Sequence, residues 1–451
     1  MTNQKKIEKS LKYSILDGSF WAVMFGFGET YLAAFAVFLR ASDVQIGLLT
    51  SLPLLLGSLS QFFSMKLIKL FNSRKKFVVV TALIQALMWI PIIFVFYLHN
   101  WSVYFLILFV IIYLVSGMIS APAWNSWISD LVNPNERGKY FGNRSRIIGL
   151  ITLISVSLGG IILDVLKDGI TKQYLGFAAL FSAAMVARLI SVLFLNKKYD
   201  PGLYVREKDK FTFKSFLKQI RYRNFGMLVL FLAFMNFSVY IAGPFFVAYW
   251  LYDLNLSYIA YMIIIVSAFV AKYISLPIWG SFIDIYGTKK IMALNGFVMP
   301  IVPILWLFST NIYYMIFIQL LAGISWAGFE LSSFNFIFDT TTPEKRPRCI
   351  SYYNVINGIM IFLGTTIGSL IVKYNNLFWT KYYLVFLISG ILRYVISFTF
   401  LPKLKEVRKV YDISYNKIFF KLVHTIMIER FHVGFLMTYP RKLRLLYKPK
   451  T

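Results

Sequence analysis

Two acidic residues lie in the middle of long apolar stretches of this chain. Glu29 occurs within FWAVMFGFGETYLAAFAVF, and Glu330 occurs within LAGISWAGFELSSFNF. A charged residue in an apolar stretch long enough to cross a bilayer is costly, and it usually faces a cavity or a partner. Because an apolar environment favours the neutral form of a carboxyl group, each residue can carry a coupling proton or neutralise a cationic solute. The alternative is a structural carboxyl group that hydrogen-bonds to a neighbouring helix.

Three basic residues, Arg188, Lys272 and Arg393, also fall inside apolar stretches, and the first two could pair with carboxylates. Residues typical of catalysis or metal binding are scarce there. His99 lies in a loop, His424 and His432 lie near the C-terminus, and the single cysteine, Cys349, stands at the end of an apolar stretch. Catalysis needs a cluster of such groups, and the chain has no G-x-x-x-x-G-K-[ST] nucleotide loop. We therefore expect no enzyme, no metal site, no cofactor and no nucleotide-driven pump.

The elements that must position these residues are membrane-spanning helices. The chain has 451 residues, of which 58% are hydrophobic and only 15% are charged, and its mean hydropathy is +0.67. Apolar runs of about 20 residues, the length needed to cross the hydrocarbon core, recur throughout the chain. We expect twelve spans near 15–39, 45–68, 77–98, 103–131, 148–164, 174–195, 226–251, 258–283, 291–309, 312–338, 350–372 and 381–401.

The net charge of +28 is a signal of topology. Of the 47 lysines and arginines, 39 fall in the segments on the side of the two termini, 5 fall in the opposite loops and 3 fall inside spans. Basic residues are retained in cytoplasmic loops, so we expect both termini in the cytoplasm of a multi-pass protein of the cell membrane. The same charges favour an anionic inner leaflet as a partner. The placement of these charges in the loops on one side argues against nucleic acid as a binding partner.

The chain contains an internal repeat. At an offset of 209 residues, Asp130 falls on Asp339 and Gly149 falls on Gly358, while at an offset of 215 residues Ser42 falls on Ser257. We therefore expect an all-α membrane protein of two pseudo-symmetric six-helix bundles, 1–195 and 226–401. A basic cytoplasmic linker at 196–225 joins them, and a basic tail follows at 402–451. Within the tail, 418–428 is too short to span, and we expect an amphipathic helix on the inner leaflet.

This organisation resembles the major facilitator superfamily of transporters. The most specific local match is GSFIDIYGTKK, which is similar to the family loop motif G-x-x-x-D-x-x-G-x-[KR]-[KR] through Gly280, Asp284, Gly287, Lys289 and Lys290. The first-half copy, MKLIKLFNSRKK (65–76), departs from the motif because methionine, lysine and asparagine replace both glycines and the aspartate. The stretch PAWNSWISDLVNPNERGKYFGNR resembles an uncharacterised group of bacterial members of the family.

The resemblance implies that spans 1, 4, 7 and 10 line a central cavity. Glu29 and Glu330 are the carboxylates nearest mid-depth on these spans. The other candidates for a substrate or proton site on them are polar or aromatic residues, each of which can instead be a packing residue: Trp124, Asn125, Trp127, Asn236, Tyr240 and Asn335.

Charged residues on the cytoplasmic side form a second candidate group. We expect a cytoplasmic latch that breaks when this side opens. Besides the motif residues given above, its candidate members are Asp130, Arg137, Arg144, Arg146, Asp339 and Arg346. Arg137 or Arg74 is expected to pair with Asp130. The alternative is that these are solvated charges that set topology and contribute about 0–1 kcal/mol per pair.

The resulting hypothesis is a secondary active transporter that moves a small solute by alternating access. We expect it to be proton-coupled and monomeric. The alternative is a transporter-like protein that handles lipids, or a membrane receptor without solute flux.

Overall fold

The computed structural model describes residues 3–133, 137–202, 213–341, 346–378, 380–408 and 410. These residues form helices and the turns between them, without a strand. The expected amphipathic helix at 418–428 lies outside the described residues.

The first half of the chain contains the following helices: α1 (Asn3–Phe27), η1 (Glu29–Tyr31), α2 (Leu32–Phe38), α3 (Asp43–Ser60), η2 (Gln61–Phe63), α4 (Ser64–Phe71), α5 (Arg74–Leu87), α6 (Trp89–Phe94), η3 (Val95–Trp101), α7 (Ser102–Leu131), α8 (Arg137–Val165) and α9 (Ile170–Lys197).

The short helix α10 (Phe213–Gln219) follows. The second half contains α11 (Asn224–Ala242), α12 (Phe245–Ala248), η5 (Tyr249–Asp253), α13 (Tyr258–Tyr286), α14 (Thr288–Val298), α15 (Ile301–Leu305), α16 (Ile312–Thr340), α17 (Arg346–Tyr374), α18 (Tyr383–Phe400) and η6 (Leu401–Lys403).

The described residues contain 11 stretches that are long and apolar enough to cross a membrane. One of them, Arg74–Leu131, is 58 residues long, about twice the length of the others. Inside it His99 adopts a non-helical conformation with φ 48° and ψ −113°, and α7 beyond this kink packs back against α5. This stretch therefore crosses twice, and the expected twelve-helix membrane fold is confirmed.

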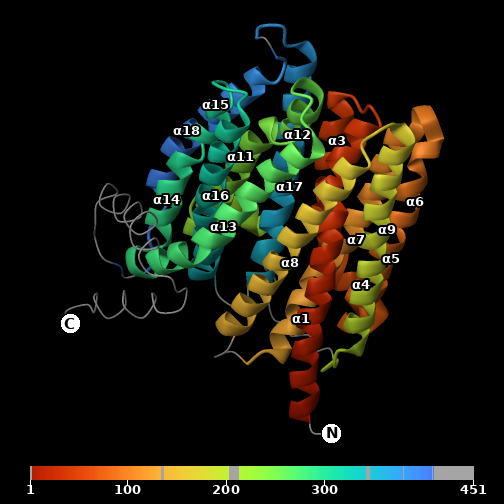
Figure 1. Ribbon diagram of the computed structural model, residues 1–451. Helices are drawn as coiled ribbons and strands as arrows, with labels where there is room; N and C mark the ends of the chain where they lie inside the picture. Colours follow the sequence, from red (N-terminus) through yellow and green to blue (C-terminus); the bar gives the residue numbers. More distant parts are fainter. Residues whose placement is uncertain are drawn as a thin grey trace, which may run out of the picture.

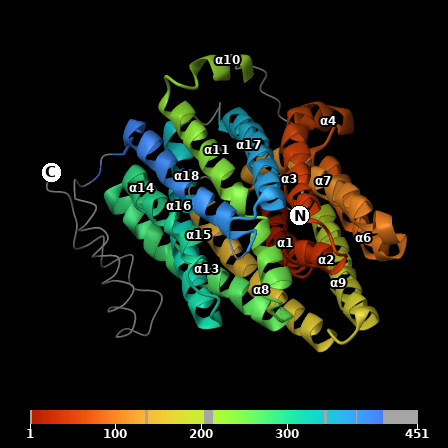
Figure 2. The same cartoon turned by 90° about the horizontal axis from the view of Figure 1, so that it is seen from above.

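The two halves repeat the same packing (Figures 1 and 2). In the first half α1 packs against α8 and α9, and in the second half α11 packs against α17 and α18. In the same way, α3 packs on α7 and α13 packs on α16. The halves meet along two helix pairs, α3 with α17 and α8 with α13. Because α3 corresponds to α13 and α8 corresponds to α17, the pseudo-symmetry relates these two interfaces to each other.

Residues matched in the sequence repeat have matching local roles. Ser42 accepts a hydrogen bond from the Gln45 amide at the start of α3, and Ser257 accepts one from the Ala260 amide at the start of α13. A serine hydroxyl at this position satisfies an amide that has no partner inside the helix. Gly149 and Gly358 both lie at contacts between the halves, against Tyr273 and Ser58 respectively. The repeat in the sequence is therefore a repeat in three dimensions.

Helix α17 approaches α11 closely through the sequence GTTIG (364–368). A Cβ atom at Gly364 would clash with the carbonyl oxygen of Phe237, and one at Gly368 would clash with that of Ile241. Glycines four residues apart let two helix backbones pack closely inside a bilayer.

Gly364→Leu is expected to destabilise the second half by about 1–3 kcal/mol, the usual cost of overpacking. Thermal unfolding of the purified protein in detergent measures the effect. Gly142→Leu is a matched control, because Gly142 is also helical and a Cβ atom added there would meet no atom within 4 Å. Equal melting temperatures for the two variants would contradict the close approach.

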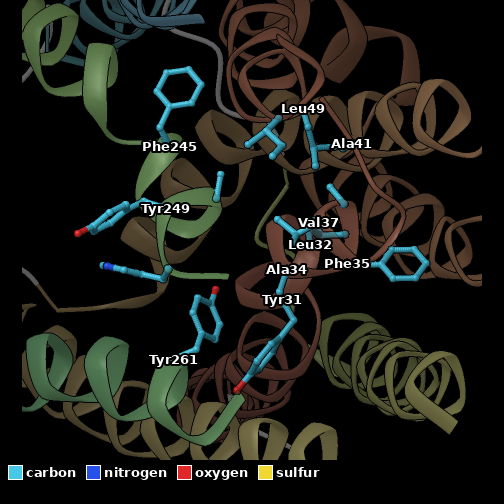
Figure 3. Packing of buried hydrophobic residues seen from close by; sticks show 14 of the residues in the cluster. Tyr31, Leu32, Ala34, Phe35, Val37, Ala41, Leu49, Phe245, Tyr249 and Tyr261 are labelled. Carbon is cyan, nitrogen blue, oxygen red and sulfur yellow. The ribbon is translucent and has the colours of Figure 1, made fainter. Parts of the chain in front are cut away.

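The packing between the halves differs at the two ends of the molecule. We call the end that carries the N-terminus, the α7–α8 turn and α10 the linker face, and the opposite end the distal face. On the distal side one hydrophobic cluster contains residues of both halves, among them Tyr31 and Leu49 of the first half and Phe245, Tyr249 and Tyr261 of the second (Figure 3). Toward the linker face the hydrophobic clusters are separate, and each belongs to one half. The molecule is therefore closed by shared packing on the distal face.

Candidate functional site

Glu330 forms an ion pair with Lys272. Lys272 lies midway along α13, Glu330 lies on α16, and the Lys272 Nζ is 2.5 Å from the Glu330 Oε2. The Glu330 side chain remains 50% exposed and that of Lys272 26% exposed. The Glu330 carboxylate also interacts electrostatically with the phenols of Tyr240, Tyr273 and Tyr353, which lie on α11, α13 and α17 respectively. Glu330 therefore faces an accessible space inside the helix assembly.

A cavity of about 330 Å³ lies next to this ion pair, inside the second half. Its walls come from α11, α12, η5, α13, α15, α16 and α18, and it is mainly aromatic and aliphatic. The polar or aromatic lining residues are Phe246, Trp250, Phe269, Lys272, Trp306, Gln319, Trp326, Glu330 and Arg393. An apolar cavity with a few polar groups is the usual form of a small-molecule site.

Glu29 lies at a break in the first membrane-spanning segment. Helix α1 ends at Phe27, and Glu29 opens the short η1 turn before α2 continues. Its Oε2 accepts a hydrogen bond of 3.0 Å from the hydroxyl of Tyr113 on α7. The neighbouring Gly28 is packed against the ring of Trp89. The structure thus places this carboxyl group against a neutral donor, whereas Glu330 has a cationic partner.

The remaining candidates divide between the cavity region and other sites. Tyr240 is brought near Glu330, as described above. The Asn236 amide donates to Asn357 Oδ1 of α17 at 2.8 Å, so it links two helices of the second half. Asn335 donates to the carbonyl of Leu331 in its own helix, and Asn125 is exposed. The structure therefore groups Tyr240 with Glu330, and it gives Asn236 and Asn335 local partners.

Trp124 and Trp127 belong to a buried charge cluster near the linker face. Lys198 is buried, pairs with Asp17, and lies 5.7 Å and 5.4 Å from the centres of the two indole rings. The Trp127 indole N–H donates to the Tyr199 carbonyl at 2.9 Å, and the Arg144 guanidinium lies 4.7 Å from the Trp124 ring. Burial lowers the pKa of Lys198, and the Asp17 carboxylate opposes this effect. These two tryptophans thus pack around cations near the linker face, and neither lines the cavity beside Glu330.

The loop motif of the second half is held by the segment that follows η6. Gly287 has φ 90° and ψ 159°, a conformation that suits only glycine. Beyond it, the Lys289 amide donates to Glu406 Oε2 at 2.8 Å, so this carboxylate satisfies the start of α14. Arg408 bridges Asp339 at 2.8 Å and Asp284 at 3.4 Å. The aspartate of the motif is therefore bound by an arginine beyond the last helix.

The first-half loop, whose sequence departs from the family motif, has an analogous arrangement. Asn72 replaces the second glycine and adopts φ 50°, which asparagine tolerates. Ser73 donates to Asp200 Oδ2 at 2.6 Å, as Thr288 donates to Glu406 in the second half. Arg74 pairs with Asp130 at 2.7 Å, which confirms one of the two expected partners of Asp130. In each half, an acid that follows the last helix thus accepts a hydrogen bond from the hydroxyl residue in this loop.

The expected latch residues have described ion pairs within single halves. Asp130 pairs with Arg74, Arg144 with Asp17, and Asp284 and Asp339 with Arg408. Arg146 is exposed, and a Cβ atom added at Gly280 would lie 3.9 Å from the Leu331 side chain. The side chains of Arg137 and Arg346 lie outside the described residues. A latch between these groups is therefore a proposal for another conformation of the molecule.

On the distal face, polar contacts do join the two halves. Asp43, at the start of α3, pairs with Lys381 at 2.6 Å and accepts a hydrogen bond from Tyr382 at 2.7 Å. Tyr252 donates to the carbonyls of Val37 and Ala41, each at 3.0 Å. The sequence analysis missed these residues because Asp43 and Lys381 look like ordinary loop charges. The only sequence signal was that Lys381 is one of few basic residues on that side.

Comparisons with known proteins agree with this geometry. The family model described as Major Facilitator Superfamily matches residues 14–246 and again 227–411, so that together the two matches cover both halves. The chain belongs to the major facilitator superfamily. This membership makes it a multi-pass membrane transporter with a small-molecule substrate. A search of curated proteins found no match.

Solved structures of superfamily members share the fold. A mutant of the nucleoside transporter NupG has a TM-score of 0.67 at 14% identity, covering 89% of this chain and 100% of that one. A bacterial homologue of the iron transporter ferroportin, in an inward-facing state, has a TM-score of 0.66 at 14% identity, covering 89% and 99%. The xylose transporter XylE from E. coli, partially occluded and inward open, has a TM-score of 0.65 at 10% identity, covering 90% and 100%. At these identities the likeness concerns the fold alone.

Proposed function

We propose that this superfamily member is a secondary active transporter that moves a small solute by alternating access. The observation that carries the proposal is the unequal closure of the two ends. The halves share a core and several polar contacts on the distal face, whereas toward the linker face their cores are separate and a hydrogen bond of 3.0 Å from Asn354 to Gln61 joins them. Rocking of two bundles about a central site exchanges such a closure from one side to the other. With the linker face in the cytoplasm, as the distribution of basic residues predicts, this conformation is inward-facing.

The cavity beside Lys272 and Glu330 is the site at which we propose that the solute binds. It lies next to paired charges at mid-depth and below the shared distal core. A solute held there is separated from the distal side by the shared core, and this inward-facing conformation releases it toward the linker side.

Proton coupling is assigned to Glu29. Burying a neutral carboxyl group costs less free energy than burying a carboxylate without a cation, and the described hydrogen-bond partner of Glu29 is the neutral Tyr113 hydroxyl. Glu330 is compensated by Lys272, so its charge is stable in the present conformation. Movement of α1 relative to α7 changes the environment of Glu29 and thereby couples protonation to the conformational cycle.

The experiment has two stages. Purified protein in detergent is first screened by thermal shift with sugars, amino acids, nucleosides, organic anions, cationic drugs and lysolipids. A ligand at a hundredfold excess over its Kd stabilises the folded state by about 2.7 kcal/mol. The stabilising solute is then followed into proteoliposomes with and without a pH gradient. Stabilisation by lysolipids alone, with no flux of any solute, would replace the transporter proposal by a lipid-handling role.

Glu29→Gln is expected to abolish accumulation driven by the pH gradient while solute exchange at equal concentrations continues, because only the coupled step needs the carboxyl group. Uptake is measured between pH 5.5 and 8. Glu8→Gln is the control, since Glu8 is an exposed glutamate of the same membrane-spanning stretch, Gln4–Phe38. Gradient-driven accumulation that persists in Glu29→Gln with its pH dependence intact would remove Glu29 from the coupling mechanism.

A further inference from the structure

The cavity in the second half contains a buried cation without an anionic partner. Arg393 of α18 is 4% exposed and lines the cavity. Its described hydrogen bond is a long one, 3.4 Å from Nη1 to the Met299 carbonyl, and its Nε has no partner among the described residues. A guanidinium group presents five donors in a plane and is always charged, so burying it without a counter-ion is costly.

A second buried donor lines the same cavity. Trp250 of η5 is 5% exposed, and its indole nitrogen also has no hydrogen-bond partner among the described residues. Buried polar groups in native structures are normally hydrogen-bonded, so an unpartnered donor that lines a cavity calls for an explanation. Two unsatisfied donors that line one cavity, one on η5 and one on α18, indicate an acceptor that the described residues do not supply.

The net charge of the lining residues determines the sign of the charge that the ligand must carry. Lys272 and Glu330 neutralise each other at 2.5 Å, which leaves Arg393 as the uncompensated charge among the described lining residues. The remaining walls are largely aromatic. The rings of Phe246 and Trp306 pack against that of Trp250, and Trp326 also lines the cavity. Such walls hold a flat apolar body by stacking or edge contacts.

We propose that the cavity binds a small organic monoanion that carries a carboxylate on an aromatic or similarly flat body. Arg393 holds the carboxylate, the Trp250 indole N–H donates to it, and the aromatic walls enclose the ring. This inference rests on the proposed transport function, because it names the class of solute that the same site accepts. Because Lys272 and Glu330 neutralise each other, the single uncompensated charge of Arg393 matches a monoanion.

A series of indoles tests the sign of the charge at constant shape. Indole-3-acetate is the anion, tryptophan the zwitterion, tryptamine the cation and indole-3-ethanol the neutral member. Binding to the purified full-length protein in detergent at pH 7 is measured by thermal shift and by titration calorimetry. Indole-3-acetate is expected to bind more tightly than the other three by about tenfold or more, because a hydrogen bond to a charged group is worth roughly 1.5–3 kcal/mol.

Arg393→Gln is expected to weaken indole-3-acetate binding by about tenfold to a hundredfold and to leave indole-3-ethanol binding unchanged. Arg393→Lys, which keeps the charge, is expected to retain part of the affinity. Arg188→Gln is the matched control, because Arg188 is a buried arginine of α9, the corresponding last helix of the first half. If Arg393→Gln does not fold, Trp250→Phe removes the second donor and keeps the ring.

Equal binding of all four indoles, preference for tryptamine, or full affinity in the variants of Arg393 and Trp250 would overturn the inference. Binding is measured without a membrane, so its outcome is separate from that of flux. Charge-selective binding without uptake in proteoliposomes would leave the anion site in place and contradict transport. Uptake of another class of solute, with no charge-selective binding of the indoles, would contradict only the anion site.

Discussion

Glu330→Gln is expected to reduce solute uptake at least tenfold and to lower the stability of the protein. The substitution leaves the Lys272 ammonium without its carboxylate at mid-depth in the membrane. Breaking a fully buried pair costs about 3–5 kcal/mol, and we expect about 1–2 kcal/mol here because half of the Glu330 side chain is exposed. Thermal unfolding and proteoliposome uptake measure the two effects.

The double variant Lys272→Gln/Glu330→Gln separates the two effects. It removes both charges, so its melting temperature is expected to return toward that of the wild type. Uptake is expected to remain low, because the charges beside the cavity are absent. Lys373→Gln, an exposed lysine at the end of α17, is the control. Recovery of uptake in the double variant would show that the pair only stabilises the fold.

Asp43→Asn is expected to shift the molecule toward a conformation that is open on the distal face. The substitution removes an ion pair of 2.6 Å and weakens a hydrogen bond of 2.7 Å between the halves. Hydrogen bonds to charged groups contribute about 1.5–3 kcal/mol each, so the population of the open form is expected to rise about tenfold or more. Burial and the hydrogen bond to Asp43 raise the pKa of Tyr382, and its hydroxyl therefore remains a donor at physiological pH.

Distances between spin labels on the distal face measure this shift. Cys349 is the only cysteine and is buried, so Cys349→Ser provides a background for labels at Lys167 and Tyr313, which are exposed and lie in different halves. A longer distance is expected in Asp43→Asn. Asp253→Asn is the matched control, because Asp253 bonds to Thr380 of its own half. An unchanged distance distribution in Asp43→Asn would show that apolar packing alone closes this face.

The sequence by itself determined the membrane architecture. Hydropathy over about 20 residues is a local property, so the twelve spans could be recognised one by one. The offsets of 209 and 215 residues identified the repeat, and the structure gives Ser42 and Ser257 the same capping role. Arg74 was correctly considered as a partner for Asp130, and Lys272 as a partner for a carboxylate. These predictions succeeded because each depends on residues that are close in the sequence, or on a charged residue that has few possible partners of opposite charge.

Only the tertiary structure decided which polar groups meet. Trp124 and Trp127 looked like cavity residues, but they surround the buried Lys198, because the rotation of α7 about its axis directs them toward the end of α9. A helix that is apolar on every side carries no periodic signal of this rotation. Asp43 and Lys381 are 338 residues apart, and their pairing depends on how the two halves are docked. The same docking closes the distal face, and the packing of several helix segments around Arg393 creates the cavity, so neither can be read from any single segment.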